Sequence, residues 1–242
     1  SQSNTFDLLI FIAISFILFS IFLNTSLNYK NELLFDKFDK FFNLNYKMFL
    51  ENPAYNNEQF GWIEVICGSM FSGKTEELIR RVKRAKIANQ KVKIFKPIID
   101  SRSKNYIESH DDNKLESIEV KSSSEILNKL KNCDVVAIDE AQFFDDEIVD
   151  VCNKIANNGI RVIIAGLDMD YLGNPFGPMP NLMAISEYVT KVHAVCKKSG
   201  NVANYSYRKN KKKDIVVIGE KDKYEPLSRA VFFKKMKKNK SK

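Results

Sequence analysis

Residues 68–75 read Gly68-Ser69-Met70-Phe71-Ser72-Gly73-Lys74-Thr75 and match a phosphate-binding loop at every fixed position. An apolar, β-favouring stretch (62–67) precedes them, and a helical pattern (76–85) follows. In this order of strand, loop and helix, backbone N–H groups of the loop and helix start face the phosphates. Lys74 can then reach the β- and γ-phosphates, and the Thr75 hydroxyl can ligate Mg²⁺. An ordinary glycine turn needs none of these fixed residues, so the sequence predicts nucleoside-triphosphate binding.

Strands and helices alternate after the loop. Continuous apolar runs favour strands buried on both faces of a parallel sheet, and amphipathic runs between them favour helices. The expected strands are 92–96, 135–138 and 161–165, and the expected helices are 123–130 and 145–157, the second ending at Asn158-Gly159. Residues 98–115 are polar and aperiodic and are expected to form a long functional loop. The pattern predicts a doubly wound, mostly parallel α/β sheet.

The pattern changes after Gly166. Glycines and prolines crowd into a loop at 173–180, and short extended runs follow at 189–195, 202–207 and 215–218. These runs predict a small β-rich domain at 189–233 that covers the site of a core at 48–188. A lysine-rich tail at 234–242 follows, and we expect it to be solvated and disordered.

Two acids end the apolar strand at 135–138. Asp139 fits the residue that holds Mg²⁺ together with Thr75. Glu140 is a candidate base, either for water, as in a motor-type ATPase, or for a substrate hydroxyl, as in a small-molecule kinase. In the loop after the second strand, Arg102 could neutralise charge on a transferring phosphoryl group, with Asp100 close by.

Charge, a missing guanine motif and cysteine usage indicate which partners, nucleotide and compartment to expect. The net charge is +8, and removing the six lysines of the tail leaves +2, so no basic surface for nucleic acid is expected. The segment 210–214 misses the guanine-binding pattern N-K-x-D by one position, which favours ATP. The four cysteines (Cys67, Cys133, Cys152 and Cys196) form no C-x-x-C pair, which is typical of a reduced, cytoplasmic protein.

Residues 8–23 are almost continuously apolar, a marginal length for a membrane span. They can be read as a membrane anchor or as a hydrophobic interaction segment. We favour a third interpretation, in which residues 1–47 are not part of the working enzyme and the functional chain starts at Met48. No membrane partner is then expected.

Several motifs together resemble a known family. Residues 68–81, with Asp139-Glu140-Ala141-Gln142-Phe143-Phe144, are similar to the type II, cytosolic thymidine kinases. Gly166-Leu167-Asp168-Met169-Asp170-Tyr171, followed by Pro175-Phe176-Gly177, matches the next motif of that family. Val217-Ile218-Gly219 with Asp222-Lys223-Tyr224 matches the last. The resemblance runs from about residue 48 to 234 and implies a P-loop core with a lasso-type small domain.

The resemblance implies roles for individual residues. Glu140 would deprotonate the deoxyribose 5′-hydroxyl, with Arg102 near it and Lys74 on the phosphates. Asp100 would lie near the phosphates or metal, and Asp139, Glu140, Ala141 and Gln142 would join residues 68–75 in the ATP site. The residues implied for the thymidine site are Met70, Phe143, Leu167, Tyr171, Ser206, Tyr224 and the backbone of Ile215, Val216, Val217, Ile218 and Gly219. Of Phe143 and Phe144, one is expected to pack under the sheet.

The resemblance also implies a homotetramer, feedback inhibition by dTTP and salvage of thymidine for DNA synthesis. Many members carry a zinc ion held by two C-x-x-C pairs, where this chain has Cys196, Ser199, Ser228 and Val231. One thiol cannot replace four zinc ligands, so no structural zinc is expected. Packing through Tyr205, Tyr207, Phe232 and Phe233, or subunit contacts, would then hold the small domain.

Two rival functions stay open. One is a phosphate-loop ATPase or switch protein anchored by residues 8–23. The other is a degraded kinase that binds its substrates without turnover.

Overall fold

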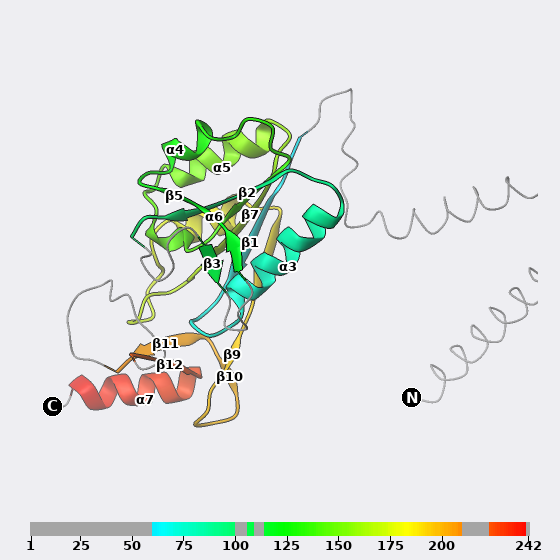
Figure 1. Cartoon of the computed structure of the whole chain (residues 1–242). Coiled ribbons are helices and arrows are strands. Elements are labelled where there is room, and N and C mark those ends of the chain that lie inside the picture. The colour runs from blue at the N-terminus through cyan, green and yellow to red at the C-terminus, as the bar shows by residue number, and fades with distance from the viewer. Residues whose placement is uncertain (1–59, 100–105, 109–113, 210–222, 241–242) are drawn as a thin grey trace, which may run out of the picture. The chain divides into compact units, whose positions relative to one another are not determined.

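The computed structural model describes residues 60–99, 106–108, 114–209 and 223–240. A six-stranded parallel sheet in the order β5-β2-β6-β7-β1-β8 forms the core (Figure 1). Its strands are β1 (Ile63–Cys67), β2 (Val92–Pro97), β5 (Ile118–Val120), β6 (Val135–Ile138), β7 (Arg161–Gly166) and β8 (Tyr188–Lys191). The predicted α/β fold is confirmed, and the apolar runs at 135–138 and 161–165 are central strands.

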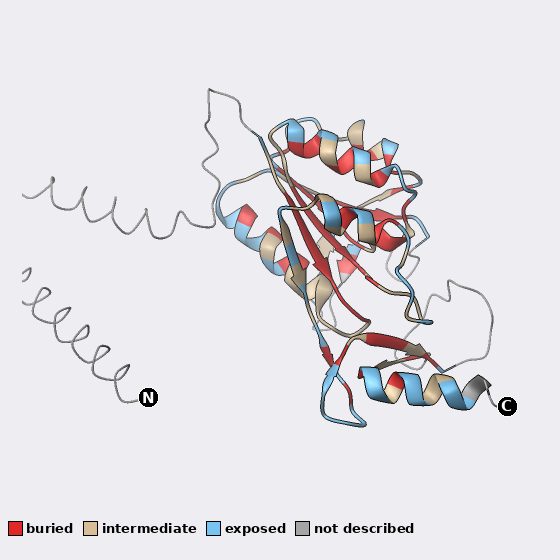
Figure 2. Ribbon diagram, turned by 180° about the vertical axis from the view of Figure 1, so that it is seen from behind, coloured by how far each residue is buried: buried red, intermediate tan, exposed pale blue. Residues whose placement is uncertain are grey.

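Helices cover both faces of the sheet, which is why its central strands are buried throughout (Figure 2). Helix α3 (Lys74–Ile87) packs on one face through Leu78 and Val82, against Ile66 and Ile163. Helices α4 (Ser124–Leu127), α5 (Ile148–Asn157) and α6 (Met179–Ile185) belong to the hydrophobic cluster on the other face. Alternate residues of β6 and β7 thus enter opposite clusters, as the two-residue period of a strand requires.

Three expected elements differ from the structure. The loop expected at 98–115 contains an antiparallel hairpin, β3 (Tyr106–Glu108) and β4 (Lys114–Glu116), whose pair Ile107 and Leu115 packs with α3. Only these two apolar residues mark it, which is too few for a periodic signal. Helix α4 is shorter than expected, and the Ser123 hydroxyl donates to Asp145 instead of capping the helix. The glycine- and proline-rich loop ends in α6, because proline suits the first turn of a helix.

The described residues of the small C-terminal part form two antiparallel ribbons and one helix. Its elements are β9 (Ala194–Val195), β10 (Val202–Ala203), β11 (Tyr205–Arg208), β12 (Tyr224–Leu227) and α7 (Arg229–Lys240). The run expected at 189–195 is divided, because its first part is the edge strand β8 of the main sheet. The segment 215–218 lies outside the described residues.

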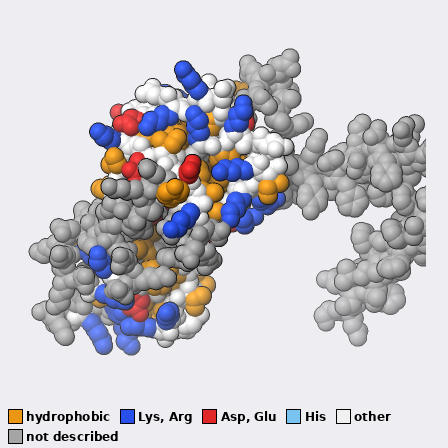
Figure 3. Space-filling model, in the orientation of Figure 1, with side chains coloured by type: hydrophobic (Ala, Val, Ile, Leu, Met, Phe, Trp, Pro, Cys, Tyr) orange, Lys and Arg blue, Asp and Glu red, His pale blue; other side chains and the backbone are white. Residues whose placement is uncertain are grey.

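Aromatic stacking holds the small part together, as predicted. The rings of Tyr205 and Phe232 stack with centroids 4.5 Å apart, and Tyr207 and Phe233 pack edge-on against Phe232. The expectation of a disordered tail is wrong up to residue 240, because α7 continues through it (Figure 3 shows its basic side chains). Lys235 pairs with Glu225 at 2.7 Å, so one tail lysine is an anchor.

No helix within the described ranges has the length and apolarity to cross a membrane. The apolar run at 8–23, the proposed start at Met48 and the rest of the segment 1–47 lie outside those ranges.

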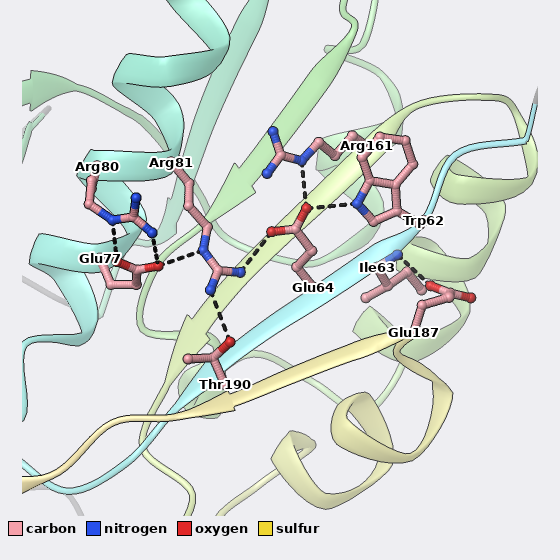
Figure 4. A network of polar contacts seen from close by, with 9 residues as sticks. All are labelled: Trp62, Ile63, Glu64, Glu77, Arg80, Arg81, Arg161, Glu187 and Thr190. Carbon is pink, nitrogen blue, oxygen red and sulfur yellow. Dashed lines mark hydrogen bonds and ion pairs between the residues drawn. The ribbon is translucent and has the colours of Figure 1, made fainter. Parts of the chain in front are cut away.

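A buried ion network fixes α3 against the sheet (Figure 4). Glu64 on β1 is 6% exposed and binds Arg81 of α3 at 2.7 Å and Arg161 of β7 at 2.6 Å. Arg81 also contacts Glu77 at 2.8 Å and donates to Thr190 of β8 at 2.9 Å. Three neighbouring strands and the helix therefore share one charge cluster.

We predict that Glu64→Gln lowers the free energy of unfolding by about 3 kcal/mol, because two largely buried guanidinium groups lose their counter-charge. Urea denaturation measures the change. Arg80→Ala is the control, since Arg80 is exposed and pairs with Glu77 on the same helix; it should cost less than about 0.5 kcal/mol. Equal losses in the two variants would contradict a special role for Glu64.

The same network predicts acid sensitivity. Burial alone would raise the pKa of Glu64, but hydrogen bonds and charges from Arg161, Trp62 and Arg81 lower it below 4.5. A hydrogen bond from Arg80 leads the effects that lower the pKa of Glu77 to about 2. Because both values are depressed in the folded state, their stabilisation is complete above the unfolded value of 4.5 and is lost as the pH falls through the folded values.

Unfolding measured between about pH 6 and pH 3 should therefore show a steeper loss of stability in the wild type than in Glu64→Gln. If the stability of the two proteins fell in parallel with pH, Glu64 would not contribute to the acid response.

Candidate active site

The phosphate loop occupies residues 68–73 between β1 and α3, as predicted. Gly68 and Gly73 have positive φ angles of 148° and 84°, and a Cβ on Gly68 would lie 2.2 Å from the carbonyl oxygen of Val192. Both glycines are therefore required by the backbone. The Lys74 ammonium donates to the Ser69 carbonyl at 2.8 Å, so its charge lies over the loop. No described side chain caps the N-terminus of α3, which suits anion binding there.

Asp139 follows β6 and Thr75 lies at the start of α3, which follows β1; the two residues meet although β1 and β6 are not neighbours. Strand β7 lies between β1 and β6, yet the Thr75 hydroxyl donates to Asp139 Oδ2 at 3.3 Å. Asp139 is only 6% exposed and sits at the carboxyl end of β6. A hydroxyl and a carboxylate beside a phosphate loop are oxygen ligands of the kind that Mg²⁺ prefers. These two residues fit the metal assigned to them from the sequence.

Glu140 has a strained backbone. Its φ and ψ are 53° and 40°, in the left-handed region, and its N–H donates to Asp139 Oδ1 at 2.9 Å. For a residue other than glycine this conformation costs about 1 kcal/mol or more, and such strain clusters at functional sites. A short 3₁₀ helix, η2 (Ala141–Phe143), follows directly. The turn separates the directions of the two acids: Asp139 bonds toward Thr75, and the Glu140 carboxylate accepts from Gln142.

The other sequence-predicted residues divide into three groups. Phe144 is buried in the core, while Phe143 is half-buried and packs edge-on against Phe176 at 5.7 Å, so one of the two lies under the sheet, as expected. Met70, Leu167 and Tyr171 are half-buried, and Ser206 and Tyr224 are buried. Asp100, Arg102 and the segment Ile215, Val216, Val217, Ile218 and Gly219 lie outside the described residues.

Comparison with known proteins agrees with this geometry. The profile of the thymidine kinase family matches residues 61–232. The chain belongs to the thymidine kinase family. A protein named thymidine kinase from Bacteroides thetaiotaomicron is 56% identical over 188 residues, covering 77% of this chain and 94% of that protein. Those from Rhodothermus sp. and Porphyromonas gingivalis are 57% and 53% identical, covering 71% and 76% of this chain and 81% and 91% of theirs.

In this thymidine kinase family member the phosphate loop is bonded to the small domain. The Met70 N–H donates to Ser206 Oγ at 2.9 Å, and the Ser69 hydroxyl donates to the Ala203 carbonyl at 3.0 Å. Phe71 packs against the cluster that contains Tyr205 and Phe232. No local pattern predicts these contacts, because the partners are more than 130 residues apart.

A second unpredicted contact joins the ends of β7 and β8 near the start of the loop. Asp168, buried after β7, pairs with Lys191 of β8 at 2.7 Å. The hydrogen bond to Asp168 raises the pKa of Lys191 against the opposing effect of burial. The Val192 N–H, next along the chain, donates to the Cys67 carbonyl at 2.9 Å, so the start of the phosphate loop is held against β8.

The positions aligned with zinc ligands lie together in the small domain. The hydroxyls of Ser199 and Ser228 are 3.0 Å apart, and the N–H groups of Ser199 and Gly200 donate to the Cys196 carbonyl. Val231 packs against the same hydrophobic cluster. A thiol, two neutral hydroxyls and an apolar side chain do not fit a zinc site.

We predict that Ser206→Ala weakens binding of a non-hydrolysable ATP analogue about fivefold, since the loop loses a hydrogen bond worth about 1 kcal/mol. Isothermal titration measures the affinity. Ser199→Ala is the matched control: it removes a hydroxyl pair in the same small domain without touching the loop, and its nucleotide affinity should stay unchanged. Equal effects in the two variants would mean that the small domain supports the loop only through its overall stability.

Proposed function

We propose that this chain is an ATP- and Mg²⁺-dependent thymidine kinase that converts thymidine and ATP into dTMP and ADP. The observation that carries the proposal is the meeting of Thr75, Asp139 and Glu140 at the mouth of a complete phosphate loop, in a chain of the thymidine kinase family. Its role would be salvage of thymidine for DNA synthesis, and the reduced cysteines favour a cytoplasmic location.

Phosphate binding is assigned to residues 68–75. Loop N–H groups and the start of α3 face the phosphates, and Lys74 supplies a positive charge that can follow the β- and γ-phosphates. The two hydrogen bonds to the small domain and the network under α3 support this assignment, because they hold the loop and the helix in place.

Thr75 and Asp139 would hold Mg²⁺. When bound, the ion neutralises charge on the β- and γ-phosphates during transfer. The chain itself contributes the two oxygen ligands and the buried setting of Asp139.

Glu140 is proposed as the base that takes the proton of the thymidine 5′-hydroxyl as this oxygen attacks the γ-phosphorus of ATP and ADP leaves. Its left-handed backbone directs the carboxylate away from the metal ligands, which supports a separate role. Arg102 and Asp100 are assigned beside it from the family motif alone, as are Ala141 and Gln142 in the ATP site.

The thymine pocket is proposed to be walled by Met70, Phe143, Leu167 and Tyr171. The Arg208 guanidinium lies 3.5 Å from the Tyr171 ring centroid, a cation–π contact that would hold the ring in place. Ser206 and Tyr224 would border the pocket, and backbone groups of residues 215–219 would read the edge of the base. Inhibition by dTTP and a homotetramer are further proposals from the family, as is the absence of structural zinc.

The first test measures ADP formation by the full chain from Mg·ATP, with and without thymidine, with deoxycytidine and deoxyadenosine as controls. We expect ADP only with thymidine, together with dTMP in equal amount. Nucleoside-independent hydrolysis would favour an ATPase instead. Nucleotide binding without turnover would favour a degraded kinase.

The base is tested by Glu140→Gln. This variant keeps the shape of the side chain but cannot accept the proton, so kcat should fall roughly 10²- to 10⁴-fold while ATP affinity stays near normal. Unchanged turnover would remove Glu140 from the mechanism.

A further inference from the structure

Gln142 is a buried polar side chain at the centre of the proposed site. It lies in η2, two residues after Glu140, and is 3% exposed. A buried amide needs partners for both its NH₂ group and its oxygen, because an unpaired group would carry a desolvation penalty.

The two ends of this amide bind different strand ends. Gln142 Oε1 accepts from the Leu167 backbone N–H at 2.9 Å, and Nε2 donates to Glu140 Oε2. The orientation of the amide follows from its partners. A backbone N–H can only donate, so it must face the oxygen, and the nitrogen must then face the carboxylate, which accepts. Glutamate or methionine at this position could not make both bonds.

The backbone around Gln142 leaves its side chain little room to move. A Cβ on Gly166 would lie 3.0 Å from Gln142 Oε1 and 2.5 Å from Met179 Sδ. A Cβ on Gly177, whose φ is +50°, would lie 2.5 Å from the Gln142 carbonyl oxygen. Because both positions are glycine, the backbone can pack closely against Gln142. This close packing fixes the orientation of the amide.

We propose that Gln142 is a positioning residue for the base. It holds one oxygen of the Glu140 carboxylate and anchors it to the backbone of Leu167, a wall of the proposed thymine pocket. The base and the pocket wall are thereby fixed to each other. The role proposed here concerns the Gln142 side chain and is separate from the ATP contact that the family motif implies for this residue. The inference rests on the proposed thymidine kinase activity.

The test compares Gln142→Met with the wild type in the full chain. Methionine keeps the length and volume but makes neither bond, so the carboxylate loses its fixed position. We expect kcat for thymidine phosphorylation to fall roughly 10- to 100-fold, as a misplaced catalytic group does. Affinity for a non-hydrolysable ATP analogue should stay within about twofold of the wild type, because the phosphate contacts remain. Gln90→Met is the control. Gln90 lies just before β2, at the amino end of the parallel strands, so its replacement should leave kcat and the affinity for the ATP analogue unchanged.

A double-mutant cycle separates positioning from general structural support. In a Glu140→Gln background, Gln142→Met should reduce the residual kcat by less than about threefold, because the base that it positions is already absent. A merely structural role would give the full reduction in both backgrounds. Should Gln142→Met fail to fold, Gln142→Glu replaces it, since glutamate keeps the acceptor for Leu167 and loses the donor to Glu140.

Three results would overturn the inference: normal kcat in the folded variant, a tenfold loss of affinity for the ATP analogue, or additive losses in the cycle. A wild-type chain that does not phosphorylate thymidine would instead refute the proposed function, so the two failures are distinguishable.

Discussion

A parallel sheet covered by helices on both faces leaves few places where polar side chains can gather, and its carboxyl edge is one of them. Apart from the buried Glu64, the interior positions of β1, β6 and β7 are apolar and buried. The loop after β1, Asp139 after β6 and Leu167 after β7 therefore emerge side by side. The site follows from strand order: β7 separates β1 from β6 and puts Leu167 within reach of Gln142.

The phosphate loop is supported from two directions. Below it, Glu64 and Arg81 join α3 to three strands, so the helix cannot rotate without breaking a buried charge cluster. Beside it, Ser206 and Ala203 of the small domain bind the loop. A loop held this way is preorganised for phosphate, and the ordering cost of binding is reduced.

Much of the fold was predictable from sequence, because continuous apolar strands and amphipathic helices produce strong local periodicity. The phosphate loop, Asp139 and Glu140 were predictable for a related reason, because each follows an apolar strand directly in the sequence and so lies at the end of that strand. The hairpin at 106–116 and helix α6 were not, because two apolar residues or a proline-rich start give a weak signal. Helix α7 was also missed, since the Phe232–Tyr205 stack that anchors it depends on a distant partner. The contacts of Gln142, Ser206 and Lys191 depend on tertiary structure, and no local pattern encodes them.

The left-handed backbone of Glu140 has a consequence for the adaptation of this protein to heat. Glycine relieves that conformation, so replacing Glu140 with glycine removes strain while deleting the proposed base. The exchange would also leave the buried Gln142 NH₂ group without its carboxylate acceptor, a cost comparable to the strain that it relieves. A library designed to raise the melting temperature should therefore hold residue 140 fixed and seek its gains elsewhere, for example at exposed positions of α3 and α7.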